Sequence, residues 1–182
     1  MSHARSARLV VAGIGAALGL LVIVLSVALA RGVGQPDEGR SAGDGSLAVD
    51  FSAPLFGGGD VTLSEHNGPV FIYFWASWCV PCQEEAPVIE ALWPEYRERG
   101  YQFIGVNIWD LTRDAEAFAE ELELTFPLVR DAERSIYVEY GVQGLPVGFF
   151  LEPGLRIHSR YDGPLDEARL RSELEAIAGG ES

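Results

Sequence analysis

An apolar run that leads into a closely spaced pair of cysteines is the feature that most restricts the fold of this chain. Residues Val70 to Trp75 are apolar throughout, as expected of a central strand that is buried on both faces. The segment Trp78-Cys79-Val80-Pro81-Cys82 follows and holds the only two cysteines of the chain. From about Val80 to Arg99 the apolar side chains then recur at helical spacing. The sequence therefore predicts that a buried strand gives way to a helix at the two thiols.

The spacing of the cysteines predicts a redox pair. Two thiols separated by two residues can close into a disulfide or open into a dithiol. We expect Cys79 at the start of the helix, where unpaired backbone N–H groups and the helix dipole favour the negatively charged thiolate. Cys79 is therefore the predicted nucleophile, and Cys82 is the predicted resolving thiol.

Two structural explanations of the cysteine pair are weaker. A disulfide that closes so short a loop removes little conformational entropy from the unfolded chain, and it therefore stabilises the fold only slightly. A structural zinc site usually has four nitrogen or sulfur ligands, whereas this sequence has no second cysteine pair, and His66 and His158 are isolated. We therefore expect neither a metal nor a bound cofactor.

The N-terminal region contains a candidate membrane span. Residues 9–30 are 22 consecutive uncharged residues, enough at about 1.5 Å per residue to cross a hydrocarbon core of roughly 30 Å. Arg5 and Arg8 precede them and favour a cytoplasmic N-terminus. We expect an uncleaved single-pass anchor in the cell membrane, with the C-terminal domain on the extracytoplasmic side. A cleaved signal peptide is the alternative, because Ala28-Leu29-Ala30 has the small residues of a processing site.

Composition divides the chain into three parts: an anchor (1–30), a flexible linker rich in Gly, Ser, Asp and Gln (31–46), and one domain (47–182). All 27 acidic residues and 11 of the 13 arginines follow residue 30, a formal charge of −16. This charge disfavours nucleic acid as a partner, and it disfavours a domain that lies flat on a surface of anionic lipid. We expect that the charge keeps the domain soluble; the alternative is that it recruits basic protein substrates.

The pattern after the linker predicts an α/β core. Strands alternate with helices, which implies parallel pairing of neighbouring strands. The expected elements are a strand pair (49–51 with 61–63), a strand (101–109), a helix around 115–122, a short helix (131–140), a hairpin (147–152 with 155–161) and a last helix from about 166 that ends at Gly179. Pro87 and Pro94 are expected to kink or interrupt the helix that follows the cysteines.

Four motifs resemble one family. They are Asp50-Phe51-x-x-Pro54-Leu55, Phe74-Trp75-Ala76-Ser77-Trp78-Cys79-x-Pro81-Cys82-x-x-Glu85-x-Pro87, Phe126-Pro127-Leu128-x-x-Asp131 and Tyr140-Gly141-Val142-x-Gly144-x-Pro146-x-x-Phe149. Over about residues 48–178 the chain resembles the thioredoxin superfamily, and within it the membrane-tethered TlpA/ResA/DsbE-type thiol-disulfide oxidoreductases. The resemblance implies a thioredoxin-like α/β fold, with a central mixed sheet of four to five strands flanked by helices and an extra N-terminal β-hairpin.

The resemblance also implies roles for residues around the cysteines. Pro146 would be cis, lie against the disulfide and, with Trp78 and Leu145, contact the substrate. Glu85 would be a buried acid that assists proton transfer when the resolving thiol is activated. The alternatives are an ordinary trans proline, a Trp78 that only packs, and a Glu85 that only complements the helix dipole.

Two positions are noteworthy beside these roles. Thioredoxin has a buried Asp at the position of Tyr73, which leaves the proton-transfer role to Glu85. The family often has Thr where this chain has Val147, which leaves the substrate contacts open. Trp109 and Asp110 end a predicted strand near the expected site and are candidates to line a groove.

By this resemblance the chain would reduce disulfides in exported proteins, such as the haem-attachment cysteines of apocytochrome c, and a membrane thiol-transport protein would donate the electrons. Val80-Pro81 lacks the histidine found between the cysteines of strongly oxidising relatives, which favours the reductase direction. One alternative is a copper-related redox chaperone for respiratory oxidase assembly, and another is a non-catalytic tethered binding domain. A peroxidase would need a Pro-x-x-x-Thr-x-x-Cys arrangement, which the chain lacks.

Overall fold

Strand β3 lies at the centre of a five-stranded mixed sheet with the order β5-β4-β3-β6-β7. The computed structural model describes residues 19–20 and 45–178. The strands of this sheet are β3 (Val70–Trp75), β4 (Gln102–Asn107), β5 (Leu128–Arg130), β6 (Val147–Glu152) and β7 (Arg156–Asp162). Strands β3, β4 and β5 pair in parallel, whereas β6 pairs antiparallel with both β3 and β7. The predicted α/β thioredoxin-like core with a mixed sheet is confirmed.

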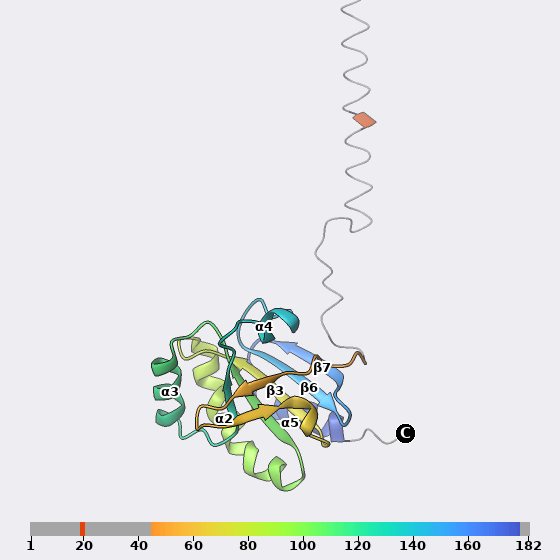
Figure 1. Cartoon of the computed structure of the whole chain (residues 1–182). Helices are drawn as coiled ribbons and strands as arrows, with labels where there is room; N and C mark the ends of the chain where they lie inside the picture. The colour runs from red at the N-terminus through yellow and green to blue at the C-terminus, as the bar shows by residue number, and fades with distance from the viewer. Residues whose placement is uncertain (1–18, 21–44, 179–182) are drawn as a thin grey trace, which may run out of the picture. The chain divides into compact units, whose positions relative to one another are not determined.

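All six residues of β3 are buried, and they point alternately to the two faces of the sheet. Phe71, Tyr73 and Trp75 belong to the core that forms against one set of helices. That set is α2 (Val80–Glu98), α3 (Thr112–Glu121) and α5 (Glu167–Ala178) (Figure 1). The side chains between them face a second core, which includes Ile136 of helix α4 (Ile136–Glu139). Because both faces are covered, β3 needs the unbroken apolar sequence that it has.

The expected N-terminal strand pair is present, but its first strand begins later than predicted. Strand β1 (Ser52–Pro54) pairs antiparallel with β2 (Asp60–Thr62), and the two lie over the second core. The backbone N–H of Leu63 still donates to the carbonyl oxygen of Phe51 at 3.0 Å, and Leu47 forms an isolated antiparallel bridge with Arg156 of β7. At Leu63 the partner strand turns into the 3-10 helix η1 (Leu63–Glu65), so the pairing of β1 with β2 does not extend further. The carboxylate of Asp50 instead accepts a hydrogen bond from the backbone N–H of Ser64 at 2.9 Å.

Other features of the fold also differ from the prediction. Strand β5 was not expected, because three residues are too few to show a periodic pattern. The helix expected over 131–140 is only α4, because the carboxylate of Asp131 accepts hydrogen bonds from the backbone N–H groups of Ser135 and Tyr137 and holds the preceding residues in a turn. Pro87 and Pro94 do not interrupt α2, which runs unbroken for 19 residues.

The predicted anchor lies outside the described residues, except for Gly19 and Leu20, and so does most of the predicted linker. At the end of that linker, Gly45 and Ser46 exchange backbone hydrogen bonds with Ile157 of β7 at 3.0 and 2.8 Å. Among the residues that the structure describes, no helix is both long enough and apolar enough to cross a membrane. The expected stop of α5 at Gly179 also lies outside the described residues.

Glycine at position 105 of β4 is required by the close packing beneath the sheet. An added Cβ would lie 2.6 Å from Cδ2 of Leu128, 2.8 Å from Cε2 of Phe126 and 3.1 Å from Nε1 of Trp75. These neighbours are themselves buried and have little room to retreat. We expect Gly105→Ala to lower the free energy of unfolding by about 1–3 kcal/mol, measured by urea denaturation. The control is Gly57→Ala, whose Cβ would have no neighbour within 4 Å and should change stability by less than about 0.5 kcal/mol. Equal losses in both variants would contradict this account.

Candidate active site

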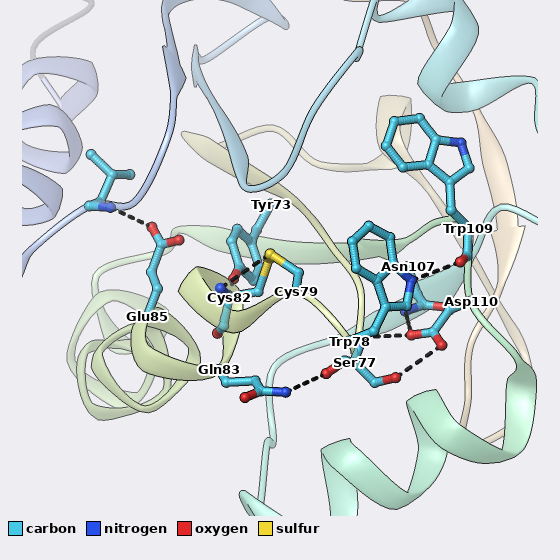
Figure 2. The surroundings of a disulfide bond; sticks show 11 residues. Tyr73, Ser77, Trp78, Cys79, Cys82, Gln83, Glu85, Asn107, Trp109 and Asp110 are labelled. Carbon is cyan, nitrogen blue, oxygen red and sulfur yellow. Dashed lines mark hydrogen bonds between the residues drawn. A yellow bond between two sulfur atoms is a disulfide. The ribbon is translucent and has the colours of Figure 1, made fainter.

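Helix α2 begins at the sulfur of Cys79. This residue occupies the N-cap position, and its Sγ accepts a hydrogen bond from the backbone N–H of Cys82 at 3.3 Å. Pro81 lies in the first turn of the helix, where a missing N–H leaves no hydrogen bond unmade. Cys79 and Cys82 form a disulfide, with their Cα atoms 5.2 Å apart (Figure 2). Cys79 is 4% exposed and Cys82 is 0% exposed, so Cys79 is the more accessible of the two.

Exposed apolar side chains lie on both sides of this sulfur in the sequence. Trp78 and Val80 are 56% and 61% exposed. Trp109 and Leu111, in the loop between β4 and α3, are also exposed, and the indole N–H of Trp78 donates to the carbonyl oxygen of Trp109 at 2.9 Å (Figure 2). This hydrogen bond joins the two loops and leaves an apolar rim on the protein surface beside the disulfide.

Pro146 lies at the same edge of the sheet as the disulfide. In the pairing of β3 with β6, Val147 is opposite Phe74, so the residue before Val147 is at the end of β3 that leads to Cys79. The Leu145–Pro146 peptide is cis, as the resemblance implied. Leu145 is partly buried and packs against the core cluster that contains both cysteines. The structure therefore brings Pro146 and Leu145 to the sheet edge that also carries Trp78.

Glu85 is a buried carboxyl group, with only 3% of the residue exposed. Its Oε1 accepts a hydrogen bond from the backbone N–H of Leu165 at 3.0 Å. Its Oε2 is buried and has no hydrogen-bond partner within the described part of the chain. Burial raises the pKa of Glu85 to about 7, although the hydrogen bond from Leu165 opposes this rise. A carboxyl group with this pKa can both hold and release a proton near neutral pH.

Tyr73 contacts the backbone of the resolving cysteine and lies near Glu85. Its hydroxyl group donates a long hydrogen bond of 3.4 Å to the carbonyl oxygen of Cys82. Burial raises the pKa of Tyr73 well above its usual value, and the neighbouring Glu85 raises it further. The phenol therefore stays protonated at physiological pH and remains a hydrogen-bond donor. Figure 2 shows Tyr73 behind the disulfide.

A pocket of about 560 Å³ opens beside Trp78. Its walls come from the loops that follow β3, β4 and β5, and they include Asp110, whose carboxylate accepts hydrogen bonds from Ser77. The groove expected near Trp109 and Asp110 is therefore present. Across residues 19–20 and 45–178, no three His, Cys, Asp or Glu side chains converge as metal ligands would.

Several residues of the site were not predicted from the sequence. Ser77, Gln83 and Leu165 contribute through hydrogen bonds that join loops or involve backbone groups. Ser77 belongs to the cysteine motif but was given no role there, and no motif marks the other two. One signal was available for Ser77 and Asp110, because the carboxyl ends of neighbouring parallel strands meet at one edge of a sheet. Tyr73 was recognised only as a replacement for an aspartate, and its contact with Cys82 was not foreseen.

The raised pKa of Glu85 predicts that its ionisation destabilises the oxidised protein. The folded protein keeps this proton up to about pH 7, whereas the unfolded chain releases it near pH 4.5. The unfolded state therefore binds fewer protons in this window, and stability falls as the pH rises, by about 3 kcal/mol in total. Glu85→Gln, which cannot ionise, should lack this loss. Urea denaturation of the wild-type protein and the variant at pH 4, 6 and 8 measures this loss, because all other groups titrate equally in the two proteins. Parallel stability profiles would show that the pKa is not raised.

Comparisons with known proteins agree with this site. The model of the AhpC/TSA family matches residues 45–159. The thiol-disulfide oxidoreductase ResA of Geobacillus thermodenitrificans is 33% identical over 134 residues, which cover 73% of this chain and 77% of the relative. ResA of Oceanobacillus iheyensis is 30% identical over 164 residues, or 87% of this chain and 85% of the relative.

Solved structures of similar proteins agree as well. The structure described as a thiol:disulfide interchange protein DsbE from Chlorobium tepidum has a TM-score of 0.71 and 29% identity, and it covers 76% of this chain and 100% of its own. These relatives are named for thiol-disulfide exchange, a reaction that a disulfide at the start of a helix can perform. The chain therefore belongs to the AhpC/TSA family, and it is a thiol-disulfide oxidoreductase of the ResA/DsbE type.

Proposed function

We propose that this protein is a membrane-tethered reductase of disulfides in exported proteins, held on the extracytoplasmic side of the cell membrane by residues 9–30. The observation that carries the proposal is the placement of the Cys79 sulfur at the N-cap of α2, next to exposed Trp78. An acidic thiol at that place can attack the disulfide of a partner protein. The sequence of the span and the preceding arginines support the tether.

The proposed cycle starts from the reduced protein. The thiolate of Cys79 attacks a substrate disulfide, which forms a mixed disulfide and releases one substrate thiolate. Cys82 then gives up its proton and attacks the sulfur of Cys79, so the second substrate thiolate leaves and the protein is left oxidised. Glu85 is the proposed acceptor of the Cys82 proton. Its pKa of about 7 suits it to accept a proton near neutral pH, and it lies near Tyr73, whose hydroxyl group hydrogen-bonds to the carbonyl oxygen of Cys82. Trp78, Leu145 and Pro146 are the proposed contacts to the substrate chain.

The substrate and the electron donor follow from the resemblance to ResA-type proteins. We infer that the substrate is a pair of cysteines in an exported protein, such as the haem-attachment pair of apocytochrome c. An exported dithiol is oxidised in each cycle and must be reduced again, so electrons from cytoplasmic thiols have to cross the membrane. A membrane thiol-transport protein is the proposed donor, and the tether would keep the domain close to it.

A Cys82→Ser variant should capture substrates as stable mixed disulfides. Cys79 can still attack in this variant, but no second thiol is left to resolve the bond. We expect covalent adducts with exported proteins that disappear on reduction, measured on non-reducing gels after rapid alkylation of cells. The matched control is Cys79→Ser, which should form no such adducts because Cys82 is inaccessible. Adducts that form equally well with both variants, or with neither, would contradict the proposed nucleophile.

The reductase direction should be visible in the equilibrium with glutathione. Pro81 before the second cysteine also occurs in reducing thioredoxins, and no histidine lies between the cysteines to stabilise the thiolate further. We expect a reduction potential nearer to about −270 mV, the value of thioredoxin, than to about −120 mV, the value of DsbA. Equilibration of the purified protein in glutathione buffers, followed by alkylation, measures the potential. A value near that of DsbA would make the protein an oxidase and would overturn the proposed direction.

A further inference from the structure

Asp110 was expected only to line a groove, but its carboxylate accepts four hydrogen bonds. It follows the end of β4, which lies beside β3 in the sheet, so its loop meets the loop that leads to Cys79. Its carboxylate accepts hydrogen bonds from the backbone N–H of Ser77 at 2.6 Å and from the hydroxyl group of Ser77 at 2.9 Å. Two more come from Nδ2 of Asn107 at 3.1 Å and from the backbone N–H of Leu111 at 2.9 Å. Both oxygens of this half-buried carboxylate are therefore engaged.

The turn Ser77-Trp78 is fixed on its other sides as well. Nε2 of Gln83, from the first turns of α2, donates to the carbonyl oxygen of Ser77 at 2.8 Å. The indole N–H of Trp78 donates to the carbonyl oxygen of Trp109. Figure 2 shows these contacts around the turn, with Asp110 on the side away from Glu85. Because Cys79 follows directly, the position of the turn affects where its sulfur lies relative to the N–H groups of α2.

We propose that Asp110 is a positioning residue, which holds the Ser77-Trp78 turn so that the sulfur of Cys79 stays at the start of helix α2. The inference rests on the proposed role of Cys79 as the attacking thiol. In the reduced protein no disulfide restrains Cys79. Its backbone stays bonded to Ala76 (3.2 Å) and Gln83 (3.1 Å), and the turn that Asp110 holds lies directly before it and helps to keep its sulfur near the backbone N–H of Cys82. These N–H groups stabilise the thiolate only when the sulfur stays within reach of them.

If Asp110 is neutralised, a positioning role and a simple charge effect predict opposite changes in the acidity of the Cys79 thiol. A negative charge near a thiol disfavours the thiolate, so removal of that charge alone would make Cys79 more acidic. If Asp110 acts by holding the turn, its loss releases the sulfur from the helix start and makes Cys79 less acidic. The pocket beside the turn also contains Asp114, Asp131, Arg130 and Arg134, which remain in every variant except the charge control.

The test compares reduced full-length protein in detergent with its Asp110→Asn variant. The rate at which iodoacetamide alkylates Cys79 is measured from pH 4 to pH 10, and its midpoint reports the acidity of the thiol. We expect the midpoint of Asp110→Asn to rise by about one pH unit toward the value of a free cysteine, near 8.5. The Ser77→Ala variant removes one of the same hydrogen bonds without any change of charge, so its midpoint should rise as well, by a smaller amount.

Asp114→Asn is the matched control, because it removes a carboxylate from the same pocket that makes no hydrogen bond to the turn. Its midpoint should stay the same or fall. A midpoint that falls or stays unchanged in Asp110→Asn would overturn the positioning role. If that variant does not fold, as judged by thermal unfolding, an unchanged midpoint in Ser77→Ala overturns it. A wild-type midpoint already near 8.5 would instead refute the acidic nucleophile on which the proposed function depends.

Discussion

The structure depends on the hydrogen bond by which the sulfur of Cys79 caps the start of helix α2. N-cap positions are usually occupied by residues whose side-chain oxygen accepts a backbone N–H, and in this protein Sγ of Cys79 takes that place. A thiolate accepts such a hydrogen bond better than a disulfide sulfur does, because the interaction is then charge-assisted. The geometry that caps α2 in the oxidised protein therefore favours the ionised thiol in the reduced one. Since β3 is buried on both faces and ends just before this cap, the sulfur arrives at the edge of the sheet, where a partner can reach it.

The parts of the fold that could be predicted from sequence are those in which burial dictates residue type over several positions. Strand β3, the hairpin of β6 and β7, and the apolar face of α5 have such patterns, and each was placed within a few residues. Strand β5 is too short for a pattern. The late start of α4 depends on the carboxylate of Asp131, which accepts hydrogen bonds from the backbone N–H groups of Ser135 and Tyr137 and holds the residues before the helix in a turn. Such local competition between side chain and backbone leaves no periodic signal.

The candidate site divides in the same way. The cysteines and Glu85 were found because a motif holds them at fixed spacing on one helix. Asp110 acts on Ser77, which is 33 positions away, and the contact exists only because β3 and β4 are parallel neighbours. Tyr73 lies on a strand whose residues are all apolar or aromatic, so nothing in its sequence context separates a hydrogen-bonding phenol from a core aromatic. To predict contacts between loops, one must know the order of the strands in the sheet, and the periodicity of each strand does not contain this information.

Two carboxyl groups flank the cysteine pair, and their surroundings suit them to different tasks. Glu85 is buried, has one backbone donor and leaves one oxygen unpaired, so its ionised form costs stability at neutral pH. An apolar side chain would avoid this cost, but it would leave the backbone N–H of Leu165 without its acceptor. The cost is consistent with a proton that must move when Cys82 reacts. Asp110 is partly buried and has four donors, so it is suited to hold a turn in place. The number of hydrogen-bond donors around each carboxyl group thus separates the group suited to exchange a proton from the group suited to fix geometry.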